Sequence, residues 1–268
     1  MADYKPAGAR ELLPIDPSAG VLPGYIAQEP TVIYLRDKLF SATDTDSPIR
    51  RGNGDVVMRF VDKAWSVKRR TEINDAEGNP LLKLRCNLAT IQGHVIAEDA
   101  EGKELFDVQG KFKLLSRHYE ATFTDIQTKA KATLHVRGDK FGSKADVVLP
   151  DGRVLAQIDR QLFTKNDIVK NNESYFIWIA QGVDVALITG ICVAVDMIKE
   201  QRTPPLSPAE RDIVKSHGGW TAFCASYGLE PWNPDENKEA KSLIHLLGRK
   251  GSDAADISLS PKSEPRSL

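Results

Sequence analysis

Four basic residues have the types and the spacing to bind a phosphate group. Lys68 and Arg70 stand before the turn sequence "DAEGN" of residues 75–79, and Lys83 and Arg85 stand after it. If the two arms pair as a hairpin, alternate residues share a face and neighbouring strands lie about 4.8 Å apart. The four cations then gather on one small face. Arginine side chains bind phosphate oxygens through two parallel hydrogen bonds, so this face suits a phosphorylated headgroup.

The register of this hairpin follows from its apolar side chains. When Ile73 faces Leu82, one face is apolar, and the opposite face carries the basic residues with Arg70 facing Arg85. A slip of one residue would mix the two faces and is therefore disfavoured. Arg69 is the one charged residue on the apolar side, so we expect either a buried carboxylate partner or a bulge in the strand there.

A solvated strand surface is the alternative interpretation of this basic face. Sheets keep charged outer faces for solubility, and Glu72, which faces Lys83 in this register, neutralises part of the charge. From the sequence both interpretations stay open: a headgroup site at Lys68, Arg70, Lys83 and Arg85, or an ordinary wet face.

No other residues form a recognisable site. The sequence lacks GxSxG, HExxH, GxGxxG and GxxxxGK[ST] motifs. The histidines do not cluster at metal-ligand spacing, although His118 and His135 fall on the polar faces of adjoining strands and could approach one another as a solvated pair. The three cysteines are scattered without a CxxC motif, which argues against a disulfide framework and a zinc site. We therefore expect no catalytic residue, no metal and no cofactor.

The composition is that of a globular protein. Of the 268 residues, 41% are hydrophobic and 27% are charged, and the formal net charge is −1. No global basic field attracts nucleic acid, so we expect no nucleic-acid partner. No apolar stretch of signal-peptide length stands at the N-terminus, so we expect a cytoplasmic location, with a peripheral membrane or nuclear location left open.

The elements that carry these residues have the pattern of β-strands. From about residue 31 to residue 179, apolar and polar residues alternate, most clearly in "HYEATFTDIQTKAKATLHVRG". Turn sequences recur at near-regular intervals: "DAEGN", "DAEGK" and "PDGR". This pattern predicts an antiparallel meander, which closes into a barrel or packs as a sandwich.

One apolar run, "VALITGICVAV", breaks the strand pattern. It extends from Val185 to Val195 between Asp184 and Asp196, and a helix that spans a bilayer needs about 20 residues. We therefore expect no transmembrane segment. A run that is apolar on all sides is typical of a helix wrapped by other structure, and it also fits a hairpin that turns at Gly190.

The two ends of the chain have a different character. Residues 1–27 are rich in proline with little apolar periodicity, and we expect a flexible N-terminal arm. Residues 203–248 predict a helical appendage, in which Ser207 begins a capping box and Gly248 is the expected stop of the last helix. We expect a disordered tail over residues 249–268.

The segment "YFIWIAQGVDVALITGICVAVDMI" resembles the end of LURP-one-related proteins, which belong to the tubby C-terminal-like superfamily. The pieces "LRDKLFS", "INDAEGNPLLKLR" and "KFKLLSRHYEATF" agree in order, and the resemblance covers roughly residues 28–200. It implies a mainly β fold. This fold is a closed antiparallel β-barrel of about twelve strands over residues 28–202, around a central buried hydrophobic helix at about residues 183–198, followed by C-terminal helices.

The same resemblance bears on function. Tubby-like domains include phosphoinositide binders, and phospholipid scramblases are thought to share the fold. The resemblance thus implies a non-enzymatic barrel that binds phosphoinositide headgroups at an anionic membrane surface, or a protein partner. A scramblase-like membrane-associated protein and an enzyme with an unrecognised site are the alternatives.

Overall fold

The structure, a computed structural model, describes residues 11–36, 46–63, 70–87, 93–113, 116–138, 144–159, 174–202, 206–230 and 234–257. The chain divides into two compact units, residues 1–198 and residues 199–268. The first unit is built of strands around one helix, and the second is built of helices.

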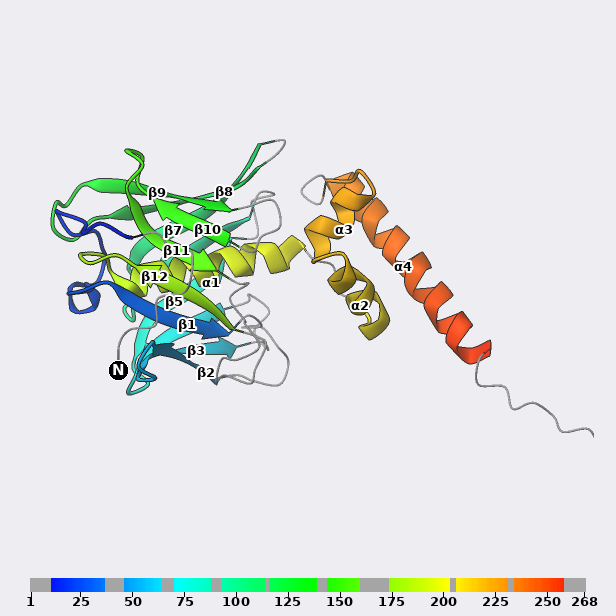
Figure 1. The fold of residues 1–268 in the computed structure, drawn as a ribbon, viewed down its shortest axis with the longest axis horizontal. Coiled ribbons are helices and arrows are strands. Elements are labelled where there is room, and N and C mark those ends of the chain that lie inside the picture. The colour runs from blue at the N-terminus through cyan, green and yellow to red at the C-terminus, as the bar shows by residue number, and fades with distance from the viewer. Residues whose placement is uncertain are drawn as a thin grey trace, which may run out of the picture. The chain divides into compact units, whose positions relative to one another are not determined.

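The first unit is a closed antiparallel barrel of twelve strands (Figure 1). Each strand pairs with its neighbours in sequence, and β1 pairs with β12 to close the barrel. The strands are β1 (Thr31–Arg36), β2 (Asp46–Arg51), β3 (Val56–Lys63), β4 (Arg70–Asp75), β5 (Pro80–Cys86), β6 (His94–Glu98), β7 (Glu104–Lys113), β8 (Ser116–Thr124), β9 (Lys131–Gly138), β10 (Lys144–Val148), β11 (Val154–Asp159) and β12 (Ser174–Ile179). The predicted fold class is therefore confirmed, and closure removes the sheet edges that would otherwise invite aggregation.

The register of the β4–β5 hairpin is the predicted one. Ile73 lies opposite Leu82 on the buried face, and Arg70 lies opposite Arg85. The register shifts between Ile73 and Asn74, which is a local irregularity that the alternation does not reveal. Arg69, the expected misfit, lies outside the described residues.

The apolar run forms one helix, α1 (Val185–Arg202), and not a hairpin. Every residue from Val185 to Val195 is buried, and Figure 1 shows the helix running among the strands of the barrel. A Cβ placed on Gly190 would lie 2.6 Å from Phe106 Cζ and 3.0 Å from Leu82 Cδ1, so the absence of a side chain there lets strand side chains approach the helix closely. The apolar surface on all sides is thus explained by strands on all sides. Among the helices that the structure describes, none has both the length and the apolar character needed to span a bilayer.

Residues 15–27, which we call the strap, correct the expectation of a flexible arm over residues 1–27. The side chains of Ile15, Ala19, Val21 and Ala27 are buried in the same core as the barrel. A short 3-10 turn, η1 (Pro23–Tyr25), lies within the strap. Proline and irregular spacing argue against a long helix or a regular strand here, but they are compatible with an extended segment that buries its apolar residues one at a time.

The second unit holds α2 (Pro208–Ser216), α3 (Trp220–Ser226) and α4 (Pro234–Ile257). They share a core of their own, made by Val214, Trp220, Phe223, Cys224, Ala240 and Ile244. The capping box at Ser207 is confirmed, since its hydroxyl accepts from the Glu210 N–H and the Glu210 carboxylate accepts from the Ser207 N–H.

The predicted helix stop at Gly248 is wrong. The last helix, α4, continues through it to Ile257, into the residues expected as a disordered tail. A Cβ on Gly248 would lie 2.8 Å from Glu210 Cγ, so this glycine makes room for a neighbouring helix instead of ending its own. Residues 258–268 lie outside the described part of the chain.

Candidate functional site

The strand register aligns three basic positions across β3, β4 and β5. Arg70 lies opposite Arg85 on one side and opposite Lys63 on the other. The third strand of this row, β3, was not part of the sequence prediction, and Lys63 is the basic residue that it adds. Lys68 lies outside the described residues.

The two cations of β5 already have partners within the protein. The Arg85 Nε donates to Glu98 Oε1 at 2.7 Å, and the Lys83 Nζ donates to the Ala100 carbonyl at 2.6 Å. The register places Lys83 between Glu72 and Glu98. The basic face is therefore partly neutralised along the Lys83 row.

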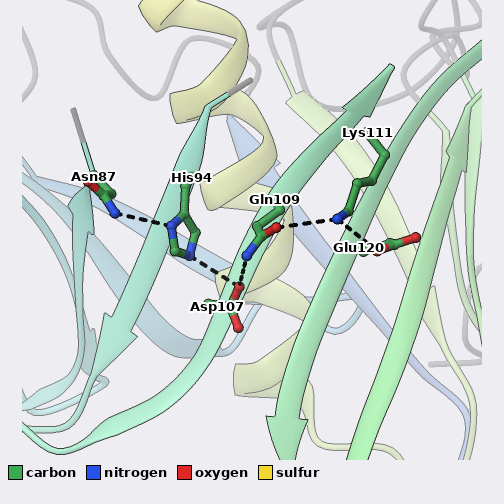
Figure 2. Close-up of polar contacts among 6 residues, drawn as sticks. All are labelled: Asn87, His94, Asp107, Gln109, Lys111 and Glu120. Atoms are coloured by element: carbon green, nitrogen blue, oxygen red, sulfur yellow. Dashed lines mark hydrogen bonds and ion pairs between the residues drawn. The ribbon is translucent and has the colours of Figure 1, made fainter. Parts of the chain in front are cut away.

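A chain of polar contacts continues along the outer wall from β5 to β8 (Figure 2). The contacts join Asn87 to His94 at 3.3 Å, His94 to Asp107 at 3.1 Å, Gln109 to Asp107 at 3.1 Å, Lys111 to Gln109 at 3.4 Å and Lys111 to Glu120 at 3.4 Å. Each side chain has a polar neighbour of complementary character, as expected for a partly buried sheet surface whose polar groups pair with one another. Such a surface can offer both donors and acceptors to a partner.

The two histidines expected to approach one another have other neighbours in register. His118 lies opposite Arg137, and His135 lies opposite Glu120. The ring of His135 is 3.8 Å from the Glu120 carboxylate. In this register His118 and His135 are diagonal neighbours on one face, and the His135 ring also lies beside the Glu120 carboxylate.

Among the described residues of the barrel, Asp184 at the start of α1 is a fully buried carboxylate. It is 0% exposed, and its Oδ1 accepts from the N–H groups of Ala186 at 2.8 Å and Leu187 at 3.1 Å. Asp184 thus caps the N-terminus of α1. Its Oδ2 accepts from Val21 at 2.9 Å and Leu22 at 2.7 Å, two donors on the strap. Burial raises the pKa of Asp184, and the four N–H donors oppose that shift.

A second buried carboxylate, Asp125, binds the same strap. Its Oδ2 accepts from the Gly20 N–H at 3.1 Å, and its Oδ1 accepts from the N–H groups of Gln127 and Thr128 and from the Thr128 hydroxyl. Burial by itself would raise the pKa of Asp125, but these donors outweigh it and the pKa is lowered. The sequence did not indicate that these two carboxylates bind the strap, because the N–H groups of Gly20, Val21 and Leu22 lie more than 100 positions away in the chain.

No metal-binding group of three His, Cys, Asp or Glu side chains is found within the described ranges. The thiols of Cys86, Cys192 and Cys224, all within the described ranges, are buried and are not joined in disulfides. Burial raises the pKa of the Cys224 thiol to about 12, so this thiol is protonated at neutral pH.

Comparisons with known proteins concern the barrel. The model of the LURP-one-related family matches residues 31–196. A crystal structure of a protein from Arabidopsis thaliana is similar at a TM-score of 0.47 and 19% identity, and the match covers 66% of this chain and 96% of that one. No curated protein matches the chain.

Proposed function

This chain belongs to the LURP-one-related family, and we propose that its barrel is a non-enzymatic domain that binds a phosphorylated headgroup at an anionic membrane surface. One observation carries the proposal: Lys63, Arg70 and Arg85 lie opposite one another on β3, β4 and β5. Like charges directly opposite one another destabilise a sheet, and a bound phosphate offsets that repulsion. The location that fits this role is cytoplasmic, at the inner surface of a membrane.

The packing of the barrel supports a site on its outer wall. Helix α1 and the inward-facing strand residues are buried against one another from Val185 to Val195. A substrate inside the barrel would compete with this core, whereas a ligand on the outer wall would not. The Arg85–Glu98 ion pair is partly exposed, so an anion of higher charge can displace the carboxylate at a small cost in free energy.

Flotation with liposomes of defined phosphoinositide content tests the proposal. The Arg70→Ala, Arg85→Ala double variant should bind about thirtyfold more weakly, because each cation near an anionic surface contributes about 1 kcal/mol. The matched control is Lys131→Ala with Arg137→Ala, which removes the same charge from exposed positions of β9. Binding should also weaken with salt, since exposed charges are screened over about 8 Å at physiological ionic strength.

A variant with the opposite expected sign sharpens the test. Glu98→Gln removes the carboxylate that holds Arg85 and should tighten liposome binding while the fold is unchanged. Equal flotation of the wild type and the Arg70, Arg85 variant would place the site elsewhere. Failure of the wild type to float with any headgroup would contradict the lipid proposal and favour a protein partner, which is the other binding role open to this face.

A further inference from the structure

We propose that the end of the barrel at the start of α1 is a recognition site for an extended peptide, and that the strap, residues 15–27, occupies it in cis. The site is formed by the turn before α1, residues 181–184, and by Asp125 with the turn that follows it. This role goes beyond headgroup binding, because it uses another part of the barrel and another chemistry. The site lies within the family match over residues 31–196, whereas the strap lies outside it.

The strap binds through its backbone, as an added strand does. The N–H of Ile15 donates to the Gln181 carbonyl at 2.9 Å, and the N–H of Ala19 donates to the Gly182 carbonyl at 2.9 Å. The Asp184 N–H donates to the Ala19 carbonyl at 3.0 Å, so the bonds run in both directions. Main-chain pairing of this kind is how proteins bind extended peptides whose side chains then set specificity.

The far end of the strap pairs with the same turn. The Ala27 N–H donates to the Val183 carbonyl at 2.9 Å, and the Gly182 N–H donates to the Ala27 carbonyl at 2.8 Å. The turn thus lies between the two ends of the strap. Gly182 has φ +84°, and a Cβ there would lie 2.2 Å from the Ile15 carbonyl oxygen, so only glycine allows this close approach.

Two carboxylates bind the backbone at the centre of the strap. The consecutive N–H groups of Gly20, Val21 and Leu22 donate to the two buried carboxylates, Gly20 to Asp125 and the other two to Asp184. Successive backbone N–H groups form a concavity that binds anions, and here the protein supplies the anions. A peptide with proline at any of these three positions would lack a donor and leave a buried carboxylate oxygen with one bond fewer.

Shape adds a second requirement at Gly20. A Cβ there would lie 2.5 Å from Asp184 Cβ and 2.8 Å from Ile26 Cδ1, so any larger residue must displace the helix cap. Gly24, by contrast, has nothing within 4 Å of such a Cβ. The ligand class is therefore an extended peptide with glycine at the Gly20 position and free N–H groups at that position and the two that follow it.

The covalent link between the strap and the barrel can be cut without removing any contact described above. Residues 28–30 are exposed and join the strap to β1. We therefore choose the full chain with a specific protease site in place of residues 28–30, folded first and cleaved afterwards. The probe is a fluorescent synthetic peptide of residues 11–27.

The cleaved strap should stay bound through gel filtration and exchange with excess labelled peptide. A Gly20→Val peptide should bind about tenfold more weakly or worse, whereas a Gly24→Val peptide should bind like the native peptide. Circular dichroism of the cleaved chain checks that the barrel stays folded during the exchange.

Three results would overturn the proposal. If the cleaved strap leaves and the labelled peptide does not bind, the end of the barrel is no receptor. If the strap never exchanges, it is a fixed part of the core. If the two valine peptides bind equally well, the close contact at Gly20 does not select the ligand.

Discussion

Replacing Asp184 by asparagine should be among the most destabilising conservative changes in the barrel. The side chain accepts four backbone N–H bonds of 2.7–3.1 Å, two on each oxygen. An asparagine of the same shape turns one oxygen into an NH2 group, so two of the four buried donors lose their acceptor. Each buried donor left unsatisfied costs about 1–3 kcal/mol. Because the amide avoids the desolvation of a charge, we expect a net loss near the lower end, about 3 kcal/mol.

The assay should report on the barrel alone and identify the bonds that were lost. Tryptophan fluorescence mixes the two units, since Trp178 belongs to the barrel and Trp220 to the helical unit. Hydrogen exchange resolved by residue avoids this. The slowest amides of the strands give the free energy of unfolding of the barrel, and the amides of Val21 and Leu22 should lose additional protection if the asparagine turns its NH2 group toward the strap.

Asp151→Asn is the matched control for this substitution. Asp151 also accepts a backbone N–H, from Arg153 at 3.0 Å, but its side chain is 53% exposed. Water can therefore accept the Arg153 N–H if the carboxylate is lost. The control should change stability by no more than about 0.5 kcal/mol. If Asp184→Asn lowers stability no more than Asp151→Asn does, the four hydrogen bonds of Asp184 do not hold the end of the barrel together.

Three further substitutions test the packing and the ionisation of other sites. Gly190→Ala should destabilise the barrel by about 1–3 kcal/mol in urea denaturation despite the higher helix propensity of alanine, and adding Phe106→Leu should recover part of the loss; additive losses would contradict the close contact. The pKa of Glu210 is lowered, first by the Ser207 N–H and then by His245, so its contribution to stability is present above about pH 4.5 and is lost on acidification. Glu210→Gln should therefore flatten the acid loss of helicity in the second unit, and an unchanged pH profile would count against this. The pKa of Asp125 is lowered as well, so its contribution to stability is also lost on acidification. Asp125→Asn should therefore flatten the acid-induced loss of hydrogen-exchange protection at the Gly20 amide. Equal pH profiles for the wild type and the variant would show that Asp125 does not hold the strap.

The parts of the fold that could be predicted are those that short-range patterns determine. The register of β4 against β5 follows from alternation around one turn, since only one pairing buries Ile73 and Leu82 together. The apolar run closed by Asp184 indicates a buried element, which the run alone leaves open as helix or hairpin, and the capping box follows from Ser207 and Glu210 three residues later. In each case the interacting residues are neighbours in sequence, so a single sequence contains the signal.

The strap could not be predicted, because its partners are distant in sequence. Asp184 accepts the N–H of Val21 across 163 positions, and Asp125 accepts that of Gly20 across 105 positions. Its buried side chains follow no period, since each fills a gap between other elements. Gly248 shows the same limit: locally it has the character of a helix stop, but its role is set by Glu210 on another helix. The Glu98 partner of Arg85 likewise lies on a strand outside the hairpin.

The two proposed binding surfaces can be separated by salt, because they differ in burial. The row of Lys63, Arg70 and Arg85 lies on the wall of the barrel, where the Arg85 pair is partly exposed, so headgroup binding must weaken as ionic strength rises. The carboxylates of Asp125 and Asp184 are 5% and 0% exposed, so their bonds to the strap are screened far less. Retention of the cleaved strap should therefore be nearly constant between low and high salt, while flotation with liposomes falls. A strap that dissociates in salt together with the liposomes would mean that surface charge, and not the buried donors, holds it in place.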